Sequence, residues 1–386
     1  MRILVLSKRQ YTGKDLLDDR YGRLFELPAA LAARGHEVVG VALSYRSRAE
    51  GWRQWPDHPL LGWHSINAAP WGGTRYPAEL LSIARDFRPD LIWACSDVPH
   101  ALIGWWLKNR LHRPLVIDLY DNFESFRLSR LPGMTALLRG ACRRADGLTL
   151  VSGTLDEYVA SRYGVTAPRL VLGNGVPKGL FFPRDRHAAR ERLRLPDNAR
   201  LIGTAGAISA GRGIADLFKA FHRLALEDQN LWLVHAGHCD ATPAQHRHPR
   251  IIDLGILSQE RVADLFSALN VAVVCNLDSP FGRYCFPQKL YEIIACGAPL
   301  VAASIGDVAN LLQAHPECLY PPGDYRALAV RIKHHLAHAK TKSVKPITWT
   351  QRGMQLEAFF LSILGPHDLS CKQNLSSAPT PIQSEK

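Results

Sequence analysis

Two charged side chains near the start of a short predicted helix are the clearest candidates for chemistry in this sequence. Lys289 and Glu292 are three residues apart in the stretch FPQKLYEIIACGAPLVAASIGDV, Phe286 to Val308, so a helix places them on one face. A cation and a carboxylate beside a helix N-terminus suit a ligand that carries both phosphates and hydroxyls. An ordinary surface ion pair is the competing interpretation, and the surrounding Pro-x-Lys and Gly-Ala-Pro context favours the ligand site.

The residues around this pair predict the elements that must hold it. Leu290, Ile293 and Ile294 share one face at helical spacing. Gly297 accepts the left-handed conformation that a helix end requires. The apolar run Leu300 to Ala303 is typical of a central parallel strand. The pair is therefore expected at an edge of a parallel sheet, where ligands bind in such folds.

A second candidate is the glycine-rich segment GAISAGRG, Gly206 to Gly213, which joins a predicted strand to a predicted helix. The backbone N–H groups of such a loop and the positive end of the helix dipole favour a diphosphate. Arg212 and Gly213 stand where a P-loop carries the Lys and Ser/Thr that bind phosphate and magnesium. We therefore expect a phosphate site that is not the P-loop of an NTPase.

Strands and helices alternate along the chain, with a strong break at Gly173-Asn174-Gly175-Val176-Pro177. This alternation predicts an α/β fold with two Rossmann-like open parallel-sheet domains that face each other across a cleft. We expect these domains at residues 1–176 and 177–345, a C-terminal helix at 346–364 that packs back towards the first domain, and a disordered tail at 365–386. Residues 45–75 show no clear period.

Composition narrows the class of protein. The 386 residues are 47% hydrophobic and carry a formal net charge of +12, which favours anionic partners. The chain has no recognisable nucleic-acid-binding module. The 8 cysteines include no CxxC pair, so a reduced cytoplasmic thiol set is expected. The sequence shows no signal-peptide pattern and no run long enough to span a bilayer, which predicts a cytoplasmic protein with peripheral membrane contact at most.

Several short motifs, in their order along the chain, resemble those of a known enzyme family. They are Arg34-Gly35-His36-Glu37-Val38, Ala145 to Ser152 (ADGLTLVS), Asn174-Gly175-Val176-Pro177, the signature residues Pro287, Lys289, Leu290, Tyr291, Glu292, Gly297 and Pro299, and Tyr320 to Ala329 (YPPGDYRALA). Each motif is weak by itself, and their common order and separation are what make the similarity specific. The chain resembles the retaining glycosyltransferases of family four (glycosyl transferases group 1), which have the GT-B fold, and the resemblance covers Arg2 to about Leu364.

The resemblance implies a function and a set of site residues. It implies transfer of a sugar, with retention at the anomeric carbon, from a nucleotide sugar to a polysaccharide, glycolipid or lipid-linked acceptor, without a metal or other cofactor. The residues that it implies for the nucleotide sugar are Gly22 (or Gly13), Gly206, Arg212, Gly213, Tyr284, Lys289 and Glu292. It implies Asp121 as the catalytic residue near the reacting sugar, and Asp118 competes for that role.

The chain departs from the family pattern at two positions. Relatives often have Gly-Arg where this chain has Gly206-Ala207, so one expected phosphate cation is absent. The usual first Glu of the family's paired-glutamate motif falls on Tyr284, or on Ser279 if an insertion is allowed. These departures leave open a catalytically weak partner subunit. A nucleotide-sugar 2-epimerase of the same fold is a further alternative, with Asp97, His100 and Asp121 as its only candidate acid–base groups.

Two other groups of residues have both a structural and a functional interpretation. His235, His238, Cys239, His246 and His248 fit no common zinc spacing, which favours surface histidines. The segment Gly104 to Arg113 and the arginines Arg127, Arg130, Arg139, Arg143 and Arg144, with Leu128, Leu131, Met134, Leu137 and Leu138 between them, mix apolar or aromatic residues with cations. Such segments suit binding to an anionic inner-membrane surface. The sequence supports equally well that they are core helices whose charged side chains face solvent.

Overall fold

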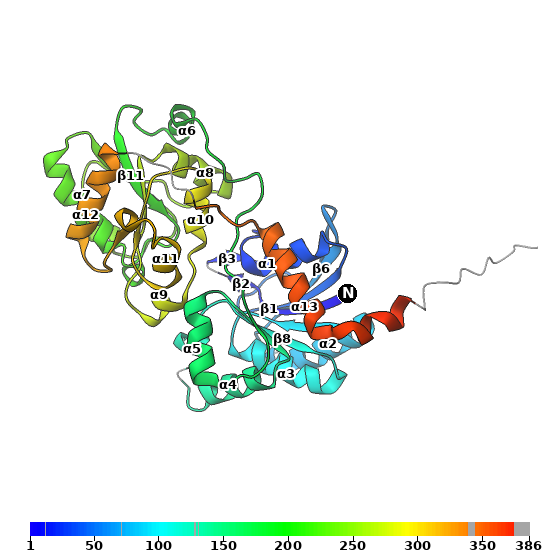
Figure 1. Ribbon diagram of the computed structural model, residues 1–386. Coiled ribbons are helices and arrows are strands. Elements are labelled where there is room, and N and C mark those ends of the chain that lie inside the picture. The colour runs from blue at the N-terminus through cyan, green and yellow to red at the C-terminus, as the bar shows by residue number, and fades with distance from the viewer. Residues whose placement is uncertain (12, 71, 127–128, 130, 339–343, 374–386) are drawn as a thin grey trace, which may run out of the picture.

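The computed structural model describes the chain except residues 12, 71, 127–128, 130, 339–343 and 374–386, and side chains are not described at 72 and 366–373. Two α/β domains lie beside each other, and the C-terminal helix crosses back onto the first of them (Figure 1). The predicted fold class is confirmed: one domain is built on an eight-stranded sheet and the other on a six-stranded sheet.

The sheet of the first domain has the strand order β10-β9-β8-β7-β1-β4-β6-β5, and every neighbouring pair is parallel except β5 with β6. The strands of this domain are β1 (Arg2–Lys8), β2 (Gln10–Tyr11), β3 (Lys14–Asp15), β4 (Glu37–Ser44), β5 (Gly51–Trp55), β6 (His58–Asn67), β7 (Leu91–Ala94), β8 (Leu115–Leu119), β9 (Gly147–Leu150) and β10 (Arg169–Val171). β2 and β3 form a separate small hairpin after β1.

Several helices of the first domain cover the faces of this sheet together with the C-terminal helix. They are α1 (Arg23–Ala32), α2 (Gly72–Phe87), α3 (Val98–Leu111), α4 (Met134–Arg144) and α5 (Gly153–Tyr163). Their starts follow local chemistry: Asp97 accepts a hydrogen bond from the His100 N–H at the start of α3, and Ser152 accepts one from Leu155 at the start of α5. α3 and α5 therefore begin within a few residues of the ends of β7 and β9.

The second domain has the all-parallel strand order β13-β12-β11-β14-β15-β16. Its strands are β11 (Arg200–Ala205), β12 (Leu231–Ala236), β13 (Ile251–Asp253), β14 (Val271–Val274), β15 (Leu300–Ala303) and β16 (Leu319–Tyr320). Its helices are α6 (Arg186–Leu193), α7 (Ala215–Glu227), α8 (Gln259–Ala268), α9 (Pro280–Tyr284), α10 (Gln288–Ala295), α11 (Gly306–Leu311) and α12 (Tyr325–Ala337), with a short 3-10 turn η3 (Ala210–Arg212) ahead of α7.

Residues 45–75 show no period in the sequence, and their described part contributes two strands to the first sheet. They contain the antiparallel β5–β6 pair at the sheet edge and the beginning of α2. A register shift lies between Gln54 and Trp55. Strands at a sheet edge are half-exposed and tolerate bulges, so their sequence does not carry the continuous apolar run that marks a central strand.

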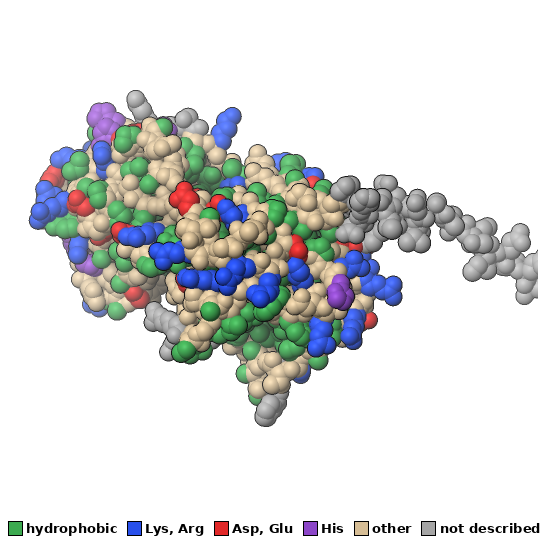
Figure 2. All heavy atoms as spheres, turned by 60° about the horizontal axis from the view of Figure 1, so that its bottom comes forward, with side chains coloured by type: hydrophobic (Ala, Val, Ile, Leu, Met, Phe, Trp, Pro, Cys, Tyr) green, Lys and Arg blue, Asp and Glu red, His purple; other side chains and the backbone are tan. Residues whose placement is uncertain are grey.

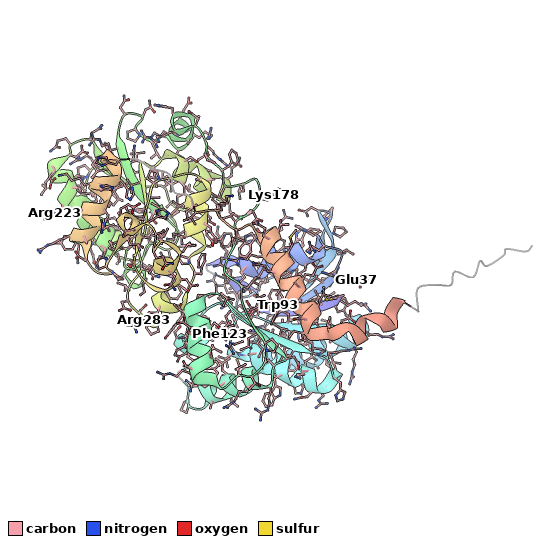
Figure 3. The ribbon with its side chains drawn as sticks, in the orientation of Figure 1. Glu37, Trp93, Phe123, Lys178, Arg223 and Arg283 are labelled. Carbon is pink, nitrogen blue, oxygen red and sulfur yellow. The ribbon has the colours of Figure 1, made fainter. Side chains whose placement is uncertain are left out.

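The chain crosses between the domains on the segment around Lys178 and returns through α13 (Trp349–Gln373) (Figures 1 and 3). α13 packs on the first domain. The centroids of the Phe360 ring and the Trp93 ring of β7 are 5.6 Å apart, and Glu357 forms ion pairs with Arg34 and His36. Residues 365–373 were expected in a disordered tail, but they are helical after a kink at Gly365 (φ 69°). Pro366 suits the first turn of a new helical segment; residues 374–386 lie outside the described part.

A buried ion pair fixes the start of α1 to the first sheet. Arg23 and Asp118 are both fully buried and make two hydrogen bonds, of 2.6 and 3.0 Å. Thr149 of β9 donates to the same carboxylate, and the Arg23 guanidinium also donates to the Leu172 carbonyl. A buried pair that is this completely hydrogen-bonded holds a single geometry. It places the turn at Gly22 next to the carboxyl end of β8.

Candidate functional site

The glycine loop after β11 is built so that a lysine lies against its backbone. Gly206 has φ 110°, and a Cβ placed on it would lie 3.3 Å from Lys289 Nζ. Gly237, which follows β12, has φ 133°, and a Cβ there would lie only 1.8 Å from the Gly206 carbonyl oxygen. Both positions have a positive φ that favours glycine, and at Gly237 a side chain would also collide with the backbone. The loop therefore presents bare peptide groups beside a cation.

Lys289 and Arg212 bring two positive charges to the same place. Burial lowers the pKa of Lys289 to about 8, and the neighbouring Arg212 charge also lowers it. Arg212 ends η3, with its guanidinium 3.6 Å from the centroid of the Phe281 ring. Gly213 (φ 69°) caps the end of η3 just before α7, and a Cβ on it would lie 3.1 Å from the Asn276 backbone. Two cations held near each other in a buried site are suited to a ligand with two negative charges.

Glu292 lies on the same helix, one turn beyond Gln288 and three residues from Lys289. Its side chain is buried, with 5% of the residue exposed, and it accepts a hydrogen bond of 2.8 Å from Gln288 Nε2. Burial raises its pKa to about 7. The first domain lies close by, since a Cβ on Gly22 would be 3.8 Å from Gln288 Oε1. Burial, followed by the charge of Glu292, raises the pKa of Tyr21 in that domain.

Gly22 forms the first-domain side of the site. It is the N-cap of α1, with φ 76° and no side-chain cap hydrogen bond. A Cβ on Gly22 would lie 2.6 Å from the Tyr11 ring and 3.8 Å from Gln288 Oε1 of the second domain. The N-terminus of α1 thus faces α10 across the domain boundary, and such a helix end favours an anion. Gly13 lies elsewhere on this boundary, next to His238.

Asp121 follows β8 and is buried between the domains. Burial raises its pKa to about 6, although the Asn122 N–H donates to it at 2.7 Å and the charges of Arg212 and Lys8 favour its ionised form. A carboxyl group of this kind can change protonation state near neutral pH, as acid–base and charge-stabilising groups in active sites do. Asp118, the competing candidate, is occupied by Arg23 and Thr149 and faces the interior of the first domain.

The structure brings together Asp121, Gly22, Gly206, Arg212, Gly213, Lys289 and Glu292, but it places Tyr284 elsewhere. The Tyr284 ring packs at a tilt of 42° on the Tyr158 ring of α5, with 4.8 Å between the ring centroids. Cys285, the next residue, faces the site: its Sγ accepts from Asn276 at 3.4 Å. Burial, followed by the Asp121 charge, raises its pKa to about 12. The helix α9 ends at Tyr284 and the chain becomes extended at Cys285, which turns neighbouring side chains in different directions.

Sequence reasoning also missed Lys8, a third cation of the site. It is the last residue of β1, and its ammonium lies 5.2 Å from the Phe126 ring centroid. Burial lowers its pKa, and the charges of Asp97 and Asp121 oppose that shift. The sequence feature that could have identified Lys8 is its position at the carboxyl end of a parallel strand, where ligands bind in such folds. The neighbouring Arg9 had the same signal but is fully buried against Asp15.

Asp97 and His100, the acid–base candidates for an epimerase, form a pair below the surface. His100 Nδ1 lies 2.5 Å from Asp97 Oδ1, and the His100 residue is only 1% exposed. Its ring packs on Tyr76, and Tyr45 donates to the other Asp97 oxygen at 3.1 Å. A histidine that is buried beneath its partner carboxylate is not presented to a sugar, so this geometry disfavours proton abstraction by His100.

Direct contacts hold the domains together beside the site. The Asp307 carboxylate of α11 accepts hydrogen bonds from the N–H groups of Gly153 (2.8 Å) and Thr154 (3.0 Å) at the start of α5. Ser152 Oγ donates to the Tyr284 carbonyl, and Thr154 Oγ1 donates to the Arg283 carbonyl, both at 2.7 Å. A carboxylate of one domain therefore caps a helix of the other.

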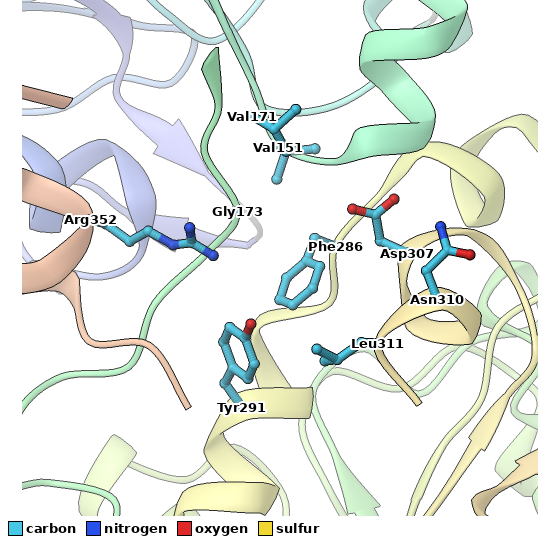
Figure 4. A pocket seen from close by; sticks show the side chains of 9 residues that line it. All are labelled: Val151, Val171, Gly173, Phe286, Tyr291, Asp307, Asn310, Leu311 and Arg352. Atoms are coloured by element: carbon cyan, nitrogen blue, oxygen red, sulfur yellow. The ribbon is translucent and has the colours of Figure 1, made fainter. Parts of the chain in front are cut away.

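A cavity of about 230 Å³ lies at the crossing segments, on another side of α10 (Figure 4). Tyr291 and Phe286 project into it from the second domain, and Arg352 of α13 reaches towards Gly173 from the opposite wall. The Arg352 guanidinium donates to the Asn174 carbonyl and to Gln355. The charged groups that line the cavity, Arg352 and Asp307, are thus hydrogen-bonded within the protein. Lys289 and Glu292 do not line this cavity.

Comparison with known proteins identifies the family. Residues 23–179 match Glycosyltransferase Family 4, and residues 199–338 match Glycosyl transferases group 1. The D-inositol 3-phosphate glycosyltransferase 1 of Catenulispora acidiphila is 31% identical over 317 residues, covering 73% of this chain and 74% of that protein. The chain is a family 4 glycosyltransferase. As a member of that family, it uses a nucleotide-sugar donor.

Other relatives of this glycosyltransferase are more distant. The N-acetyl-alpha-D-glucosaminyl L-malate synthase of Bacillus anthracis is 21% identical over 304 residues, covering 75% of this chain and 76% of that protein. The match to the D-inositol 3-phosphate glycosyltransferase of Streptosporangium roseum, 27% identical, spans about half of each protein: 53% of this chain and 51% of the relative. These names do not agree on an acceptor.

Solved structures share the fold of this glycosyltransferase. The sucrose-phosphate synthase of Thermosynechococcus elongatus superposes with a TM-score of 0.73 at 19% identity, covering 98% of this chain and 100% of that chain. HepE from Anabaena, solved in complex with UDP-glucose, has a TM-score of 0.67 at 18% identity with the same coverage. Among the described residues, no helix combines the length and the apolar character needed to cross a bilayer.

Proposed function

We propose that this glycosyltransferase transfers a sugar from a nucleoside diphosphate sugar to a polysaccharide, glycolipid or lipid-linked acceptor, with retention at the anomeric carbon. The observation that carries the proposal is that Arg212, which lies near Lys289 in the second domain, is close enough to Asp121 of the first domain for their charges to interact. In this arrangement, residues 177–345 hold the donor and residues 1–176 hold the acceptor.

The proposed reaction needs charge stabilisation more than it needs a strong nucleophile. The nucleoside diphosphate departs with growing negative charge, which Arg212, Lys289 and the bare amides of the glycine loop stabilise. Glu292 accepts hydrogen bonds from the ribose hydroxyls. Asp121 orients the acceptor or stabilises the positive charge that develops on the sugar. The cations supply what a metal supplies elsewhere, so we propose that the transfer step is metal-independent.

The acceptor side of the first domain carries features of a membrane-docking face. Leu131 and Leu137 are 55% and 47% exposed, and Arg143 and Arg144 on α4 are exposed beside them. Arg144 lies over the Trp105 ring of α3 at 4.8 Å. Figure 2, which brings the lower side of Figure 1 forward, shows basic side chains interspersed with hydrophobic ones. Arg127, Leu128 and Arg130, which the sequence included in this face, lie outside the described residues.

These features support peripheral binding to an anionic bilayer on its cytoplasmic side, where a lipid-linked acceptor is presented. Part of the basic set is not available for this role, because Arg139 is bound to Glu124 at 2.8 Å and Lys108 to Asp146 at 2.7 Å. Flotation with vesicles containing anionic lipid tests the proposal. We expect binding that weakens with salt and is reduced in Leu137→Ser/Arg144→Ser; binding that is unchanged in this variant contradicts the docking face.

The donor assignment is tested by a thermal-shift screen of nucleoside diphosphates and nucleotide sugars, beginning with UDP and UDP-glucose because HepE was solved with the latter. We expect stabilisation of the wild type that is lost in Lys289→Ala and Glu292→Ala. The matched control is Lys333→Ala, because Lys333 forms an exposed pair with Glu227 at 2.6 Å. A melting-temperature shift that survives in both site variants overturns the assignment.

Product analysis of the purified protein separates the remaining functions. Transfer or slow donor hydrolysis supports the glycosyltransferase. Conversion of the donor without an acceptor identifies a nucleotide-sugar 2-epimerase. Donor binding without turnover, in the presence of acceptor extracts, identifies a partner subunit that keeps the fold without the chemistry.

A further inference from the structure

Three potential metal ligands meet at the edge of the second sheet. His235 of β12 and Asp253 of β13 are direct partners in the parallel register of the two strands. Cys239 lies on the loop after β12, which folds back over them. His235 is only 1% exposed, so the expectation of a surface histidine was wrong at this position. The reason is that β12 is an inner strand of the sheet.

The distance between His235 and Asp253 suits a shared ion better than a direct hydrogen bond, and the Cys239 thiol, which donates to the Gly237 carbonyl at 3.6 Å, needs only a small shift to join that ion. His235 Nδ1 lies 3.4 Å from Asp253 Oδ1, and Cys239 Sγ lies 4.0 Å from His235 Nδ1 and 3.9 Å from Asp253 Oδ2. Direct N–H···O hydrogen bonds are usually about 2.7–3.2 Å long. Ligands bound tetrahedrally to Zn²⁺ at about 2.0–2.3 Å lie roughly 3.3–3.6 Å apart. All three ligand atoms lie within 4.8 Å of one another.

We propose that His235, Cys239 and Asp253 bind one divalent transition-metal ion of the zinc class, with water in the fourth position. A thiolate and an imidazole select such an ion over Mg²⁺ or Ca²⁺, which prefer oxygen ligands. Binding requires the Cys239 thiolate, so the thiol proton is released to the solvent. Cys239 is suited to this role because it is exposed, whereas the other described cysteines are buried.

The loop that carries Cys239 is bonded directly to the glycine loop of the donor site. Ile208 N–H donates to the His238 carbonyl at 2.8 Å, and Asp240 N–H donates back to the Ile208 carbonyl at 3.1 Å. Asp240 Oδ2 also accepts from the Ala210 N–H at 2.9 Å. An ion on Cys239 therefore restrains the backbone that positions Gly206 to Gly213. This consequence rests on the proposed function, whereas the metal site itself does not.

The site is tested first without any nucleotide. Protein stripped with a chelator is titrated with Co²⁺, and the absorbance of a thiolate-to-cobalt charge-transfer band is followed. We expect saturation at one ion per chain, loss of the band in Cys239→Ser, and an affinity at least about tenfold weaker in Asp253→Asn. The matched control is Asp197→Asn, because His187 and Asp197 form an exposed pair at 2.6 Å without a cysteine.

The variants Cys239→Ser and Asp253→Asn change exposed side chains, and their folding is checked by melting temperature without metal. A band that is absent from the wild type, or that persists in Cys239→Ser, overturns the site. The two substitutions are also combined in one variant. If Zn²⁺ raises the melting temperature of this Cys239→Ser/Asp253→Asn variant as much as that of the wild type, the site is overturned.

The coupling to the donor site is measured separately, as the affinity for UDP with and without Zn²⁺. We expect UDP to bind several-fold more tightly to the zinc-loaded wild type and equally with or without Zn²⁺ to Cys239→Ser. Metal binding with unchanged UDP affinity supports the site and overturns the coupling. A nucleotide screen in which nothing binds overturns the proposed function while the Co²⁺ titration still supports the metal site.

Discussion

At the scale of single residues, the candidate site gathers groups whose pKa values are displaced towards neutrality. The pKa of Lys289 is lowered to about 8, while those of Glu292 and Asp121 are raised to about 7 and about 6. Burial is the largest cause in each case, because removing a charge from water disfavours the ionised form. Such clusters concentrate at functional sites. A bound diphosphate and sugar would supply the charges and hydroxyls that these groups lack.

Lys289 makes diphosphate binding sensitive to alkaline pH. Its pKa is depressed from 10.5 to about 8, so the ammonium is present below pH 8 and is lost above it. Because the ligand is an anion, we expect the affinity for a nucleoside diphosphate to fall by about tenfold or more between pH 7 and pH 9.5. Isothermal titration calorimetry at the two pH values checks this.

The control for this pH effect is Lys289→Arg, since a guanidinium keeps its charge throughout this range. We expect the variant to bind more weakly than the wild type at pH 7 but with a much flatter dependence on pH. An equally steep loss in the arginine variant would assign the effect to another group.

Asp121→Asn removes the carboxylate without changing its size. We expect kcat for transfer to fall by about a hundredfold or more, while nucleoside diphosphate affinity stays within a few-fold because the diphosphate cations are untouched. Transfer kinetics and calorimetry measure the two effects.

The comparison variant is Asp118→Asn, which leaves the buried Arg23 charge without its partner. We expect it to lower the melting temperature strongly, since breaking a buried pair costs about 3–5 kcal/mol. If Asp121→Asn instead destabilises the fold and leaves kcat intact, Asp121 has a structural role.

At the scale of elements, the donor site depends on two neighbouring strand ends that approach closely. The turns after β11 and β12 approach each other at Gly206 and Gly237, and a side chain at Gly237 would collide with the Gly206 carbonyl. The same turns carry the backbone bonds between Ile208, His238 and Asp240. The shape of the diphosphate loop is therefore set partly by its neighbour and not by its own sequence alone.

Gly237→Ala is expected to distort this loop. The added Cβ would collide with the Gly206 carbonyl oxygen at 1.8 Å in a left-handed backbone. We expect loss of nucleoside diphosphate binding and a destabilisation of about 2 kcal/mol or more, measured by calorimetry and denaturant unfolding. The control is Gly255→Ala, where φ is also positive (63°) but the added atom meets open space. There we expect about 1 kcal/mol and normal binding.

At the scale of the whole molecule, the two domains are held near each other by the bonds between α11 and α5. Asp307 accepts from two backbone N–H groups of the opposite domain, a cap of the kind that contributes about 0.5–2 kcal/mol. This contact lies next to the strand ends that form the site. Domain separation and donor binding should therefore be linked.

Asp307→Ala is expected to favour separation of the domains. We expect a larger radius of gyration in small-angle scattering, and a smaller difference from the wild type once a nucleoside diphosphate is added. Asp278→Ala is the control, because Asp278 pairs with Arg283 within the second domain only. Scattering curves that coincide for wild type and Asp307→Ala would show that this contact does not set the domain arrangement.

Sequence reasoning predicted the local parts of this structure well. The spacing of Lys289 and Glu292 along one helix, and the strand–glycine–helix order around Gly206, follow from neighbouring residues alone. It did not predict the β5–β6 edge, because edge strands lack a strong apolar pattern. Sequence reasoning also placed Tyr284 in the nucleotide-sugar site, whereas the neighbouring Cys285 faces the site in the structure. The end of α9 decides which of these two adjacent residues points inward.

The sequence by itself determined that two α/β units follow each other and which of their residues are able to hold phosphate and hydroxyl groups. This is so because apolar periodicity, glycine positions and short-range spacing are properties of neighbouring residues. Only the tertiary structure decided that Asp121 lies near Arg212 and that Asp118 forms a buried ion pair with Arg23. It also decided that His235 lies buried beside Asp253. Those relations join residues far apart in the chain, and their chemistry depends on burial and on neighbouring charge, which arise only when the domains pack.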